Sequence, residues 1–129
     1  MPSAPAKTRK LLIIDDDQDI CEVLACAIES TLGWETKVAY SGLTGLKMAA
    51  EDQPDLILLD IMMPGLNGRD TLGHLRRTPQ TAHIPIVFIS AIAQSRNHGE
   101  LMALGPVAVI EKPFDPFELA SQLDSIMAS

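Results

Sequence analysis

The chain has 129 residues, 47% of them hydrophobic, which fits one domain with a sizeable buried core. Its net charge of −7 argues against direct nucleic acid binding, because contacts with the phosphate backbone need clustered Lys and Arg. The apolar run at residues 11–14 is too short for a secretion signal or a membrane span. We therefore expect a cytoplasmic protein that inserts into no membrane and keeps Cys21 and Cys26 as free thiols.

A polar, proline-containing segment opens the chain. We expect residues 1–9 to be a flexible N-terminal tail and residues 10–129 to fold as one domain. Short continuous apolar runs, typical of strands buried on both faces, then follow at regular intervals. A weaker run predicts a peripheral strand at residues 36–40. The strong runs are LLII (11–14), DLILL (55–59), IPIVFI (84–89) and VAVI (107–110).

Segments with helical spacing alternate with these runs. Asp17 or Asp19 is available to cap the first, and Asp115, Pro116 and Glu118 predict the start of the last. Five strand-then-helix units predict an α/β fold with a doubly wound parallel sheet, because right-handed crossovers place helices on both faces. The residues expected on buried helix faces are Ile20, Val23, Leu24, Ala27 and Ile28; Leu43, Leu46 and Ala50; Leu72 and Leu75; Leu101 and Leu104; and Leu119, Leu123, Ile126 and Met127.

Polar residues follow the apolar runs, and the carboxyl ends of parallel strands share one edge of the sheet. For the common strand order 2-1-3-4-5, Asp15, Asp16 and Asp60 are expected to meet between the first and third strands. Carboxylates about 4 Å apart repel by roughly 4 kcal/mol, so this site implies a bound cation or raised pKa values. Ligands that are all oxygen favour Mg²⁺. The polar residues at the other strand ends are Ser90, Glu111 and Lys112.

Four motifs in register, IIDDD, LILLDIMMPGLNG, VFISA and VIEKPF, resemble the receiver domain of two-component response regulators. The likeness is to the single-domain, chemotaxis-regulator kind, and it implies a flavodoxin-like (βα)5 fold with strand order 2-1-3-4-5. It also implies that Asp60 accepts a phosphoryl group from a sensor histidine kinase or a histidine phosphotransfer protein. Such a protein catalyses only its own phosphorylation and dephosphorylation.

The resemblance assigns the cofactor as well. It implies that Asp16 and Asp60 hold Mg²⁺ directly, together with the backbone carbonyl of Met62. Asp15 would act on the metal mainly through water. For Asp17 and Asp19 we prefer the simpler role of starting the next helix.

The resemblance further implies that Ser90 and Lys112 bind the phosphoryl group and that Lys112–Pro113 is a cis peptide bond. Phosphorylation would shift the conformers of a face made by the fourth helix, fifth strand and fifth helix, where an unidentified downstream protein binds. A phosphorylation-dependent dimer is a further option, and the chain is either a stand-alone receiver or an excised one. Many receivers have Tyr or Phe at the position of Val109, so we expect a quieter repacking of this face.

Two other protein classes fit part of the pattern. A haloacid-dehalogenase-like phosphohydrolase would have a second aspartate where this chain has Met62, and a flavodoxin-like nucleotide or flavin binder would have a Gly-rich or hydroxyl-rich phosphate loop. A calcium loop beginning at Asp15 fails, because Ile20 and Cys26 take its Gly and Glu positions. The apolar Met62 and Ile92 lead us to expect slow self-dephosphorylation, since they would crowd out attacking water.

Overall fold

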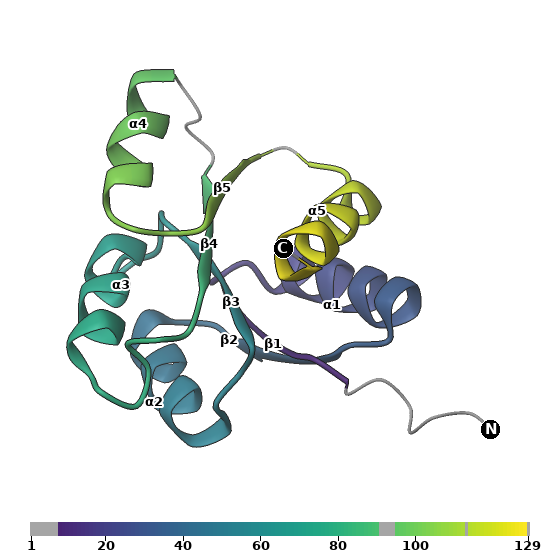
Figure 1. Cartoon of the computed structure of the whole chain (residues 1–129), viewed down its shortest axis with the longest axis horizontal. Helices are drawn as coiled ribbons and strands as arrows, with labels where there is room; N and C mark the ends of the chain where they lie inside the picture. The colour runs from purple at the N-terminus through teal and green to yellow at the C-terminus, as the bar shows by residue number, and fades with distance from the viewer. Residues whose placement is uncertain (1–7, 91–94, 113, 129) are drawn as a thin grey trace.

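The computed structural model describes residues 8–90, 95–112 and 114–128, with no side-chain description for residues 95–98. It consists of a five-stranded parallel sheet in the order β2-β1-β3-β4-β5, with a helix after each strand (Figure 1). The predicted fold class and strand order are confirmed. The strands are β1 (Lys10–Ile14), β2 (Glu35–Ala39), β3 (Leu56–Asp60), β4 (Ile86–Ser90) and β5 (Ala108–Glu111). The helices are α1 (Gln18–Leu32), α2 (Gly42–Asp52), α3 (Gly68–Arg77), α4 (Ser95–Ala103) and α5 (Pro116–Ala128).

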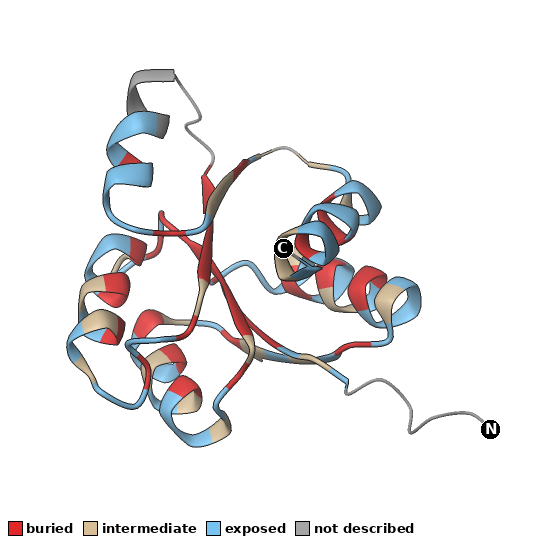
Figure 2. Cartoon of the chain, viewed as in Figure 1, coloured by how far each residue is buried: buried red, intermediate tan, exposed pale blue. Residues whose placement is uncertain are grey.

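The sheet separates two hydrophobic layers. Helices α1 and α5 cover one face, and α2, α3 and α4 lie on the other (Figure 1). Successive residues of each central strand alternate between the two layers, so β3 and β4 are buried along their whole length (Figure 2). The α1/α5 layer includes Leu11, Ile13, Leu24, Ile28, Leu58, Ile89, Leu119 and Leu123, and the other includes Leu12, Ile14, Ile57, Leu59, Leu75, Phe88 and Leu101.

Polar side chains fix where the helices begin. Asp17 is the N-cap of α1 and accepts a hydrogen bond from the backbone N–H of Ile20 at 3.1 Å. Asp19 lies in the first turn of the helix, so of the two candidate caps the structure uses Asp17. At the start of α5, Asp115 accepts hydrogen bonds from the N–H groups of Phe117 at 2.8 Å and Glu118 at 3.2 Å, as its sequence position predicts.

The buried faces of two helices differ from the prediction. In α1, Val23 is 52% exposed, and Cys21 occupies the core position instead. In α2, Leu43 is 72% exposed and Ala50 is also exposed, because the helix packs through glycine and alanine. A Cβ on Gly45 would lie within 2.9 Å of Ile14 Cγ1, so this close approach to β1 requires glycine.

Two further expectations near the end of the chain are wrong. Leu104 lies beyond the end of α4 and is exposed. The run at 107–110 is not buried on both faces: Val107 precedes β5 and is 47% exposed, while Ala108 and Val109 are half-buried. The physical reason is position, because β5 is at the edge of the sheet and pairs with β4.

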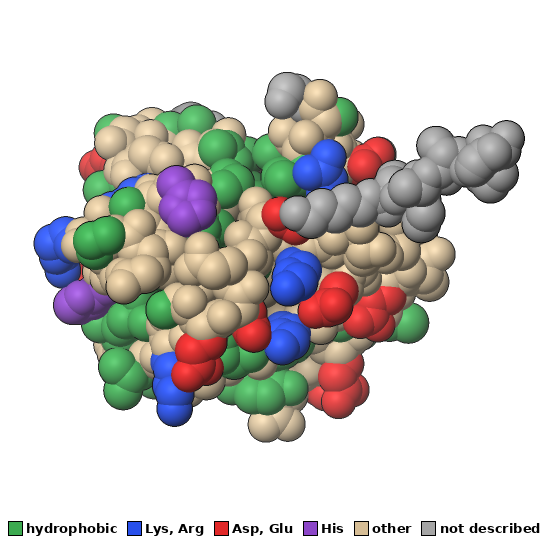
Figure 3. Space-filling model, turned by 60° about the horizontal axis from the view of Figure 1, so that its bottom comes forward, with side chains coloured by type: hydrophobic (Ala, Val, Ile, Leu, Met, Phe, Trp, Pro, Cys, Tyr) green, Lys and Arg blue, Asp and Glu red, His purple; other side chains and the backbone are tan. Residues whose placement is uncertain are grey.

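No helix in the described part of the chain is both long enough and apolar enough to span a bilayer. On the face that Figure 3 presents, Lys and Arg side chains are interspersed with Asp and Glu rather than gathered into a basic patch. That face therefore lacks the electrostatic pattern of a phosphate-backbone interface.

Candidate functional site

Two buried strands deliver carboxylates to the same edge of the sheet. β1 and β3 are neighbours with Ile14 paired to Leu59, so the residues that follow, Asp15 and Asp60, lie side by side. Both are buried, with relative exposures of 0% and 2%, whereas Asp16 is exposed. The structure brings oxygens of Asp15, Asp16 and Asp60 within 4.8 Å of one another. This is the convergence expected at the switch point of a doubly wound sheet.

Lys112 reaches the same site from β5. Its backbone N–H donates to the carbonyl of Ser90 at 2.8 Å, which fixes the residue at the end of β4 and β5. Its Nζ lies 3.4 Å from Asp60 Oδ1 and 3.5 Å from Asp15 Oδ2. The lysine side chain is only 20% exposed, so the two ion pairs are shielded from water.

The electrostatics of the site are unbalanced. Three carboxylates face one ammonium group, and burial raises the pKa of Asp60 from 3.8 to about 6, with the charge of Asp15 adding to the rise. Lys112 and the backbone N–H of Met62, which donates to Asp60 Oδ1 at 3.4 Å, act in the opposite direction and lower that pKa. Burial and Asp15 outweigh these two effects, so the ionised form of Asp60 is disfavoured without a cation. With three carboxylates and one ammonium group, the ionised site has excess negative charge that a cation can neutralise.

The loop after β3 shapes the approach to Asp60. Gly65 has a φ of +73°, a backbone conformation in which residues with a Cβ are strained. Gly68 begins α3 and donates its N–H to the carbonyl of Ile61 at 2.9 Å. A Cβ on Gly68 would meet the backbone oxygen of Asp60 and lie 2.6 Å from Ile61 Cα. Glycine at position 68 thus lets the loop close tightly against the backbone of Asp60.

Sequence reasoning missed Cys21, which is buried in α1 and contacts the backbone of Asp15. Its thiol donates to the backbone carbonyl of Asp15 at 3.3 Å, and burial, with the neighbouring Asp15 charge, raises the pKa of that thiol to about 12. Cys21 therefore stays protonated and holds the turn between β1 and α1. The available signal was spacing, because Cys21, Leu24 and Ile28 form one helical stripe.

The remaining predicted residues have the following positions. Ser90 is buried at the end of β4, in register with Glu111 of β5. Met62 is 60% exposed, and Val109 lies half-buried on β5. Two expectations fall outside the described residues: the cis peptide at Pro113 and the apolar neighbour Ile92.

The donor set fits a hard divalent cation. The three clustered carboxylates offer only oxygen, and they include one exposed residue, Asp16, through which an ion can enter. One lysine cannot neutralise three carboxylates, so a cation also relieves their mutual repulsion. Residues Asp15, Asp16 and Asp60 can therefore hold Mg²⁺ together.

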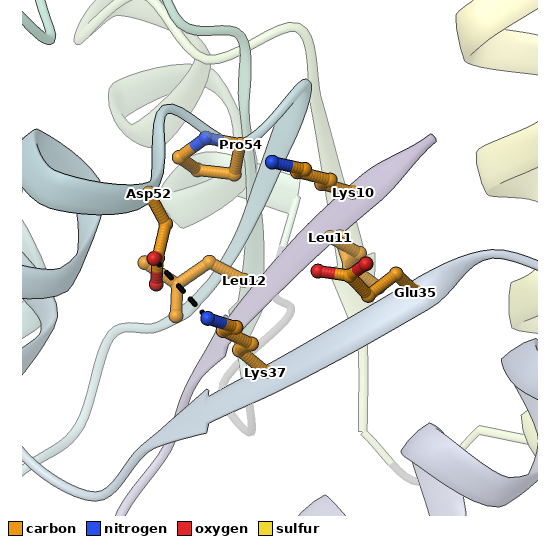
Figure 4. Close-up of a pocket in the computed structure, with 7 residues that line it drawn as sticks. All are labelled: Lys10, Leu11, Leu12, Glu35, Lys37, Asp52 and Pro54. Carbon is orange, nitrogen blue, oxygen red and sulfur yellow. Dashed lines mark hydrogen bonds and ion pairs between the residues drawn. The ribbon is translucent and has the colours of Figure 1, made fainter. Parts of the chain in front are cut away.

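Among the described residues, the acidic cluster lies at the carboxyl edge of the sheet, and the opposite edge carries a smaller feature. Figure 4 shows a small cavity there, at the amino ends of β1 and β2, where the Lys37 and Asp52 side chains form an ion pair of 3.1 Å. Its volume is about 10 Å³, enough for no more than a water-sized molecule. The chemistry of the chain is thus concentrated at the carboxyl edge.

A doubly wound sheet with buried aspartates and a lysine at its switch point places the chain in the class of open α/β proteins that bind ligands at the carboxyl ends of their strands. The sequence matches the response regulator receiver domain family over residues 11–124. The receiver domain of the Francisella response regulator 1452 is similar in structure, with a TM-score of 0.86 and 30% identity over 94% of this chain and 98% of that one. The Vibrio cholerae chemotaxis protein CheY4 has a TM-score of 0.85 and 25% identity, covering 93% and 99%.

Curated relatives lead to the same family. The phosphate regulon regulatory protein PhoB of Pseudomonas aeruginosa is 34% identical over 119 residues, which are 92% of this chain and 52% of that protein. The transcriptional regulator RpaA of Synechocystis is 32% identical over 92% of this chain and 48% of its own length. The chain thus spans about half the length of these relatives.

This chain belongs to the response regulator receiver domain family of two-component systems. Phosphorylation and Mg²⁺ binding at an acidic site are general properties of that family, whose members interact with histidine kinases or phosphotransfer proteins. Family membership decides against the phosphohydrolase and the flavin binder as alternatives.

Proposed function

We propose that Asp60 is the phosphoryl acceptor of this receiver, taking the group from a phosphohistidine on a sensor kinase or a phosphotransfer protein. The observation that carries the proposal is the placement of Asp60: it is buried, 3.4 Å from the ammonium of Lys112, and clustered with Asp15 and Asp16. A carboxylate held this way has its charge partners in position before the donor arrives.

The transfer needs positioning more than a strong nucleophile. A carboxylate oxygen of Asp60 forms a bond to phosphorus while the phosphorus–nitrogen bond of the donor breaks, and the electron pair leaves with the imidazole nitrogen. The chain thereby catalyses its own phosphorylation, and attack of water on the phosphorus of the acyl phosphate releases inorganic phosphate and regenerates the carboxylate. The transfer requires the ionised carboxylate of Asp60. Because its raised pKa of about 6 is still below neutral pH, most of the protein carries Asp60 in that form at pH 7.

Lys112 and Ser90 are assigned to the phosphoryl oxygens. Lys112 already lies against Asp60 and Asp15, so its ammonium can follow the negative charge as it moves from carboxylate to phosphoryl group. Ser90 lies at the end of the adjacent strand, and its carbonyl is tied to the Lys112 N–H. Its hydroxyl is assigned as a hydrogen-bond donor to the phosphoryl group.

Mg²⁺ is the assigned cofactor. Asp16 and Asp60 would hold it directly, Asp15 through water, and the backbone carbonyl of Met62 would complete the protein ligands. When bound, the metal supplies charge neutralisation for the phosphoryl oxygens. Two free cysteines and a phosphohistidine donor suit the reducing cytoplasm.

A groove between α1 and α5 is assigned as the docking place of the phosphodonor protein. It has a volume of about 430 Å³ and contains the exposed apolar side chains Val23, 52% exposed, and Phe117, 60% exposed. α1 begins just after the aspartates and Phe117 follows Lys112 by five positions, so both helices that line the groove start close to site residues along the chain. Apolar anchors beside a reactive centre are typical of a recruiting surface.

Output is assigned to the face formed by α4, β5 and α5. The bond between the Ser90 carbonyl and the Lys112 N–H couples the site to β5, so a movement of either residue on phosphorylation shifts that strand. With Val109 rather than an aromatic residue on β5, the shift is a repacking and not a ring rotation.

Intact mass measurement tests the proposal. With Mg²⁺ and a small acyl-phosphate donor, the wild type should gain the mass of one phosphoryl group, and Asp60→Asn should gain none. The control is Asp19→Asn, which changes an exposed carboxylate in α1 and should leave the adduct intact. An undiminished adduct in Asp60→Asn would refute Asp60 as acceptor.

The docking assignment has its own test. Phe117→Ser should slow transfer from a phosphorylated histidine phosphotransfer protein and leave phosphorylation by the small donor unchanged, because only the protein donor needs the groove. Equal slowing with both donors would mean that the substitution damages the site itself.

A further inference from the structure

The open side of β5 carries two adjoining grooves. β5 pairs with β4, and among the described strands nothing covers its other edge. One groove, of about 280 Å³, lies by the carboxyl end of β5, and the other, of about 320 Å³, runs along α5. They share Val109, Ile110 and Gln122, so we treat them as one β5–α5 groove. Its apolar lining includes Val109, Ile110, Phe114, Leu119 and Ile126, and its acidic lining is Glu111, Asp115 and Glu118.

The β5 side chains Ala108 and Val109 that line the apolar part of the groove are short. Val109 is half-buried and lines both grooves, and Ala108 beside it is also half-buried. Half-buried apolar side chains on an unpaired strand edge leave room for a bulky apolar side chain from outside. The groove therefore has the shape of a receptor for a side chain that the chain itself does not supply.

The charged side chains that line the groove are all acidic. Residues 99–128 contain five acidic residues and a single basic one, Lys112. The ammonium of Lys112 is engaged with Asp15 and Asp60 and is only 20% exposed, so it does not balance the rim. Glu111, Asp115 and Glu118 are all exposed. A partner that meets this surface encounters an apolar groove with three carboxylates at the end near the carboxyl end of β5.

We infer that the β5–α5 groove binds a basic amphipathic segment of a partner protein. A bulky apolar side chain of the segment enters beside Val109, while its Lys and Arg pair with Glu111, Asp115 and Glu118. Charge complementarity favours such a segment over a second copy of this chain, whose own groove carries the same three carboxylates and no lysine or arginine in its lining. The groove thus selects a partner of opposite charge.

Binding at the β5–α5 groove would give the output face a partner of defined charge. Only the control of this binding by phosphorylation rests on the proposed function. Ser90 and Glu111 are paired in the β4–β5 register, so the rim of the groove begins where the phosphoryl site ends. The binding itself needs no phosphorylation and can be measured on the unmodified chain. Failure of binding is therefore distinct from failure of Asp60 to accept phosphate.

The experiment uses two short fluorescent amphipathic peptides with the same apolar face, one bearing Lys and Arg and the other Asp and Glu. Fluorescence anisotropy at physiological ionic strength should show the cationic peptide binding at least about tenfold more tightly. Glu111→Gln with Glu118→Gln should weaken that binding at least about fivefold, and Val109→Phe should weaken it by filling the groove. Glu51→Gln, an exposed glutamate on α2, is the matched control and should have no effect.

Amide chemical shifts of the wild type with the cationic peptide locate the contact. Shifts at Val109 and Gln122 support the proposal, and unchanged unfolding midpoints show that the variants remain folded. Equal affinity for both peptides, an equal loss in Glu51→Gln, or shifts confined to the Asp15 and Asp60 cluster would overturn it. A dimer in sedimentation that Glu118→Gln strengthens or Val109→Phe abolishes would overturn it too, because a second copy would then be the occupant.

Discussion

Replacing Asp60 by asparagine should stabilise the metal-free protein. The substitution keeps the size of the side chain and an oxygen that can accept from Lys112 and from the Met62 N–H. It removes only the negative charge. Because Asp60 is 2% exposed and lies beside Asp15, its negative charge lowers the free energy of unfolding of the metal-free protein.

The magnitude follows from the pKa. Folding raises the pKa of Asp60 from 3.8 to about 6, and each unit is about 1.36 kcal/mol, so the ionised carboxylate costs about 3 kcal/mol. A pKa raised by folding means that stability is greatest below pH 3.8 and is lost as the pH rises to 6. Asp60→Asn should therefore gain about 3 kcal/mol at pH 8, but less than about 1 kcal/mol at pH 4.

Urea unfolding in the presence of a chelator measures this difference, with the fluorescence of the buried Trp34 as the signal. At pH 8 the gain corresponds to a rise in Tm of about 10 °C. Asp124→Asn, at an exposed carboxylate on α5, is the matched control and should change stability little at either pH. A gain that is absent at pH 8, or that is equal at both pH values, would refute the argument that burial and Asp15 raise the pKa of Asp60.

Three further outcomes are expected. Mg²⁺ affinity measured by calorimetry should fall about tenfold from pH 7 to pH 5, because protons compete for Asp60 below its pKa of about 6; a flat profile would contradict that pKa. Met62→Asn should shorten the phosphorylated lifetime by about tenfold, since an exposed amide beside Asp60 can orient water; an unchanged decay of the phosphoprotein mass would contradict this. Gly68→Ala should cost about 2 kcal/mol in urea unfolding, because its Cβ would press on the backbone of Asp60 and Ile61, whereas Gly99→Ala in α4 has open space and should not destabilise.

Sequence reasoning succeeded where local pattern and topology agree. An apolar run ending in an acid defines both a buried strand and the edge at which its carboxylate appears, which is why the cluster at Asp15, Asp16 and Asp60 could be predicted. It failed where packing depends on close approach. The buried face of α2 consists of Gly42, Gly45 and Ala49, which hydrophobic periodicity does not register.

The edge strand was the other failure. A continuous apolar run such as residues 107–110 is typical of a central strand, so its pattern predicts burial on both faces, although the expected strand order already places β5 at the edge of the sheet. The support that Cys21 gives to Asp15 was likewise invisible, because a cysteine on a helical stripe is an ordinary core residue. Both depend on where neighbouring elements lie in space.

The distance along the chain between the partners of the site has a consequence for folding. Asp15 and Lys112 are 97 positions apart and meet only after β1, β3, β4 and β5 have assembled in register. No fragment of the chain can form the site early, and contacts of such long range slow the search for the native state. A cation held at this site binds the native protein and not the unfolded chain. Raising the metal concentration therefore raises the free energy of unfolding and lowers the fraction of molecules in which the sheet is open.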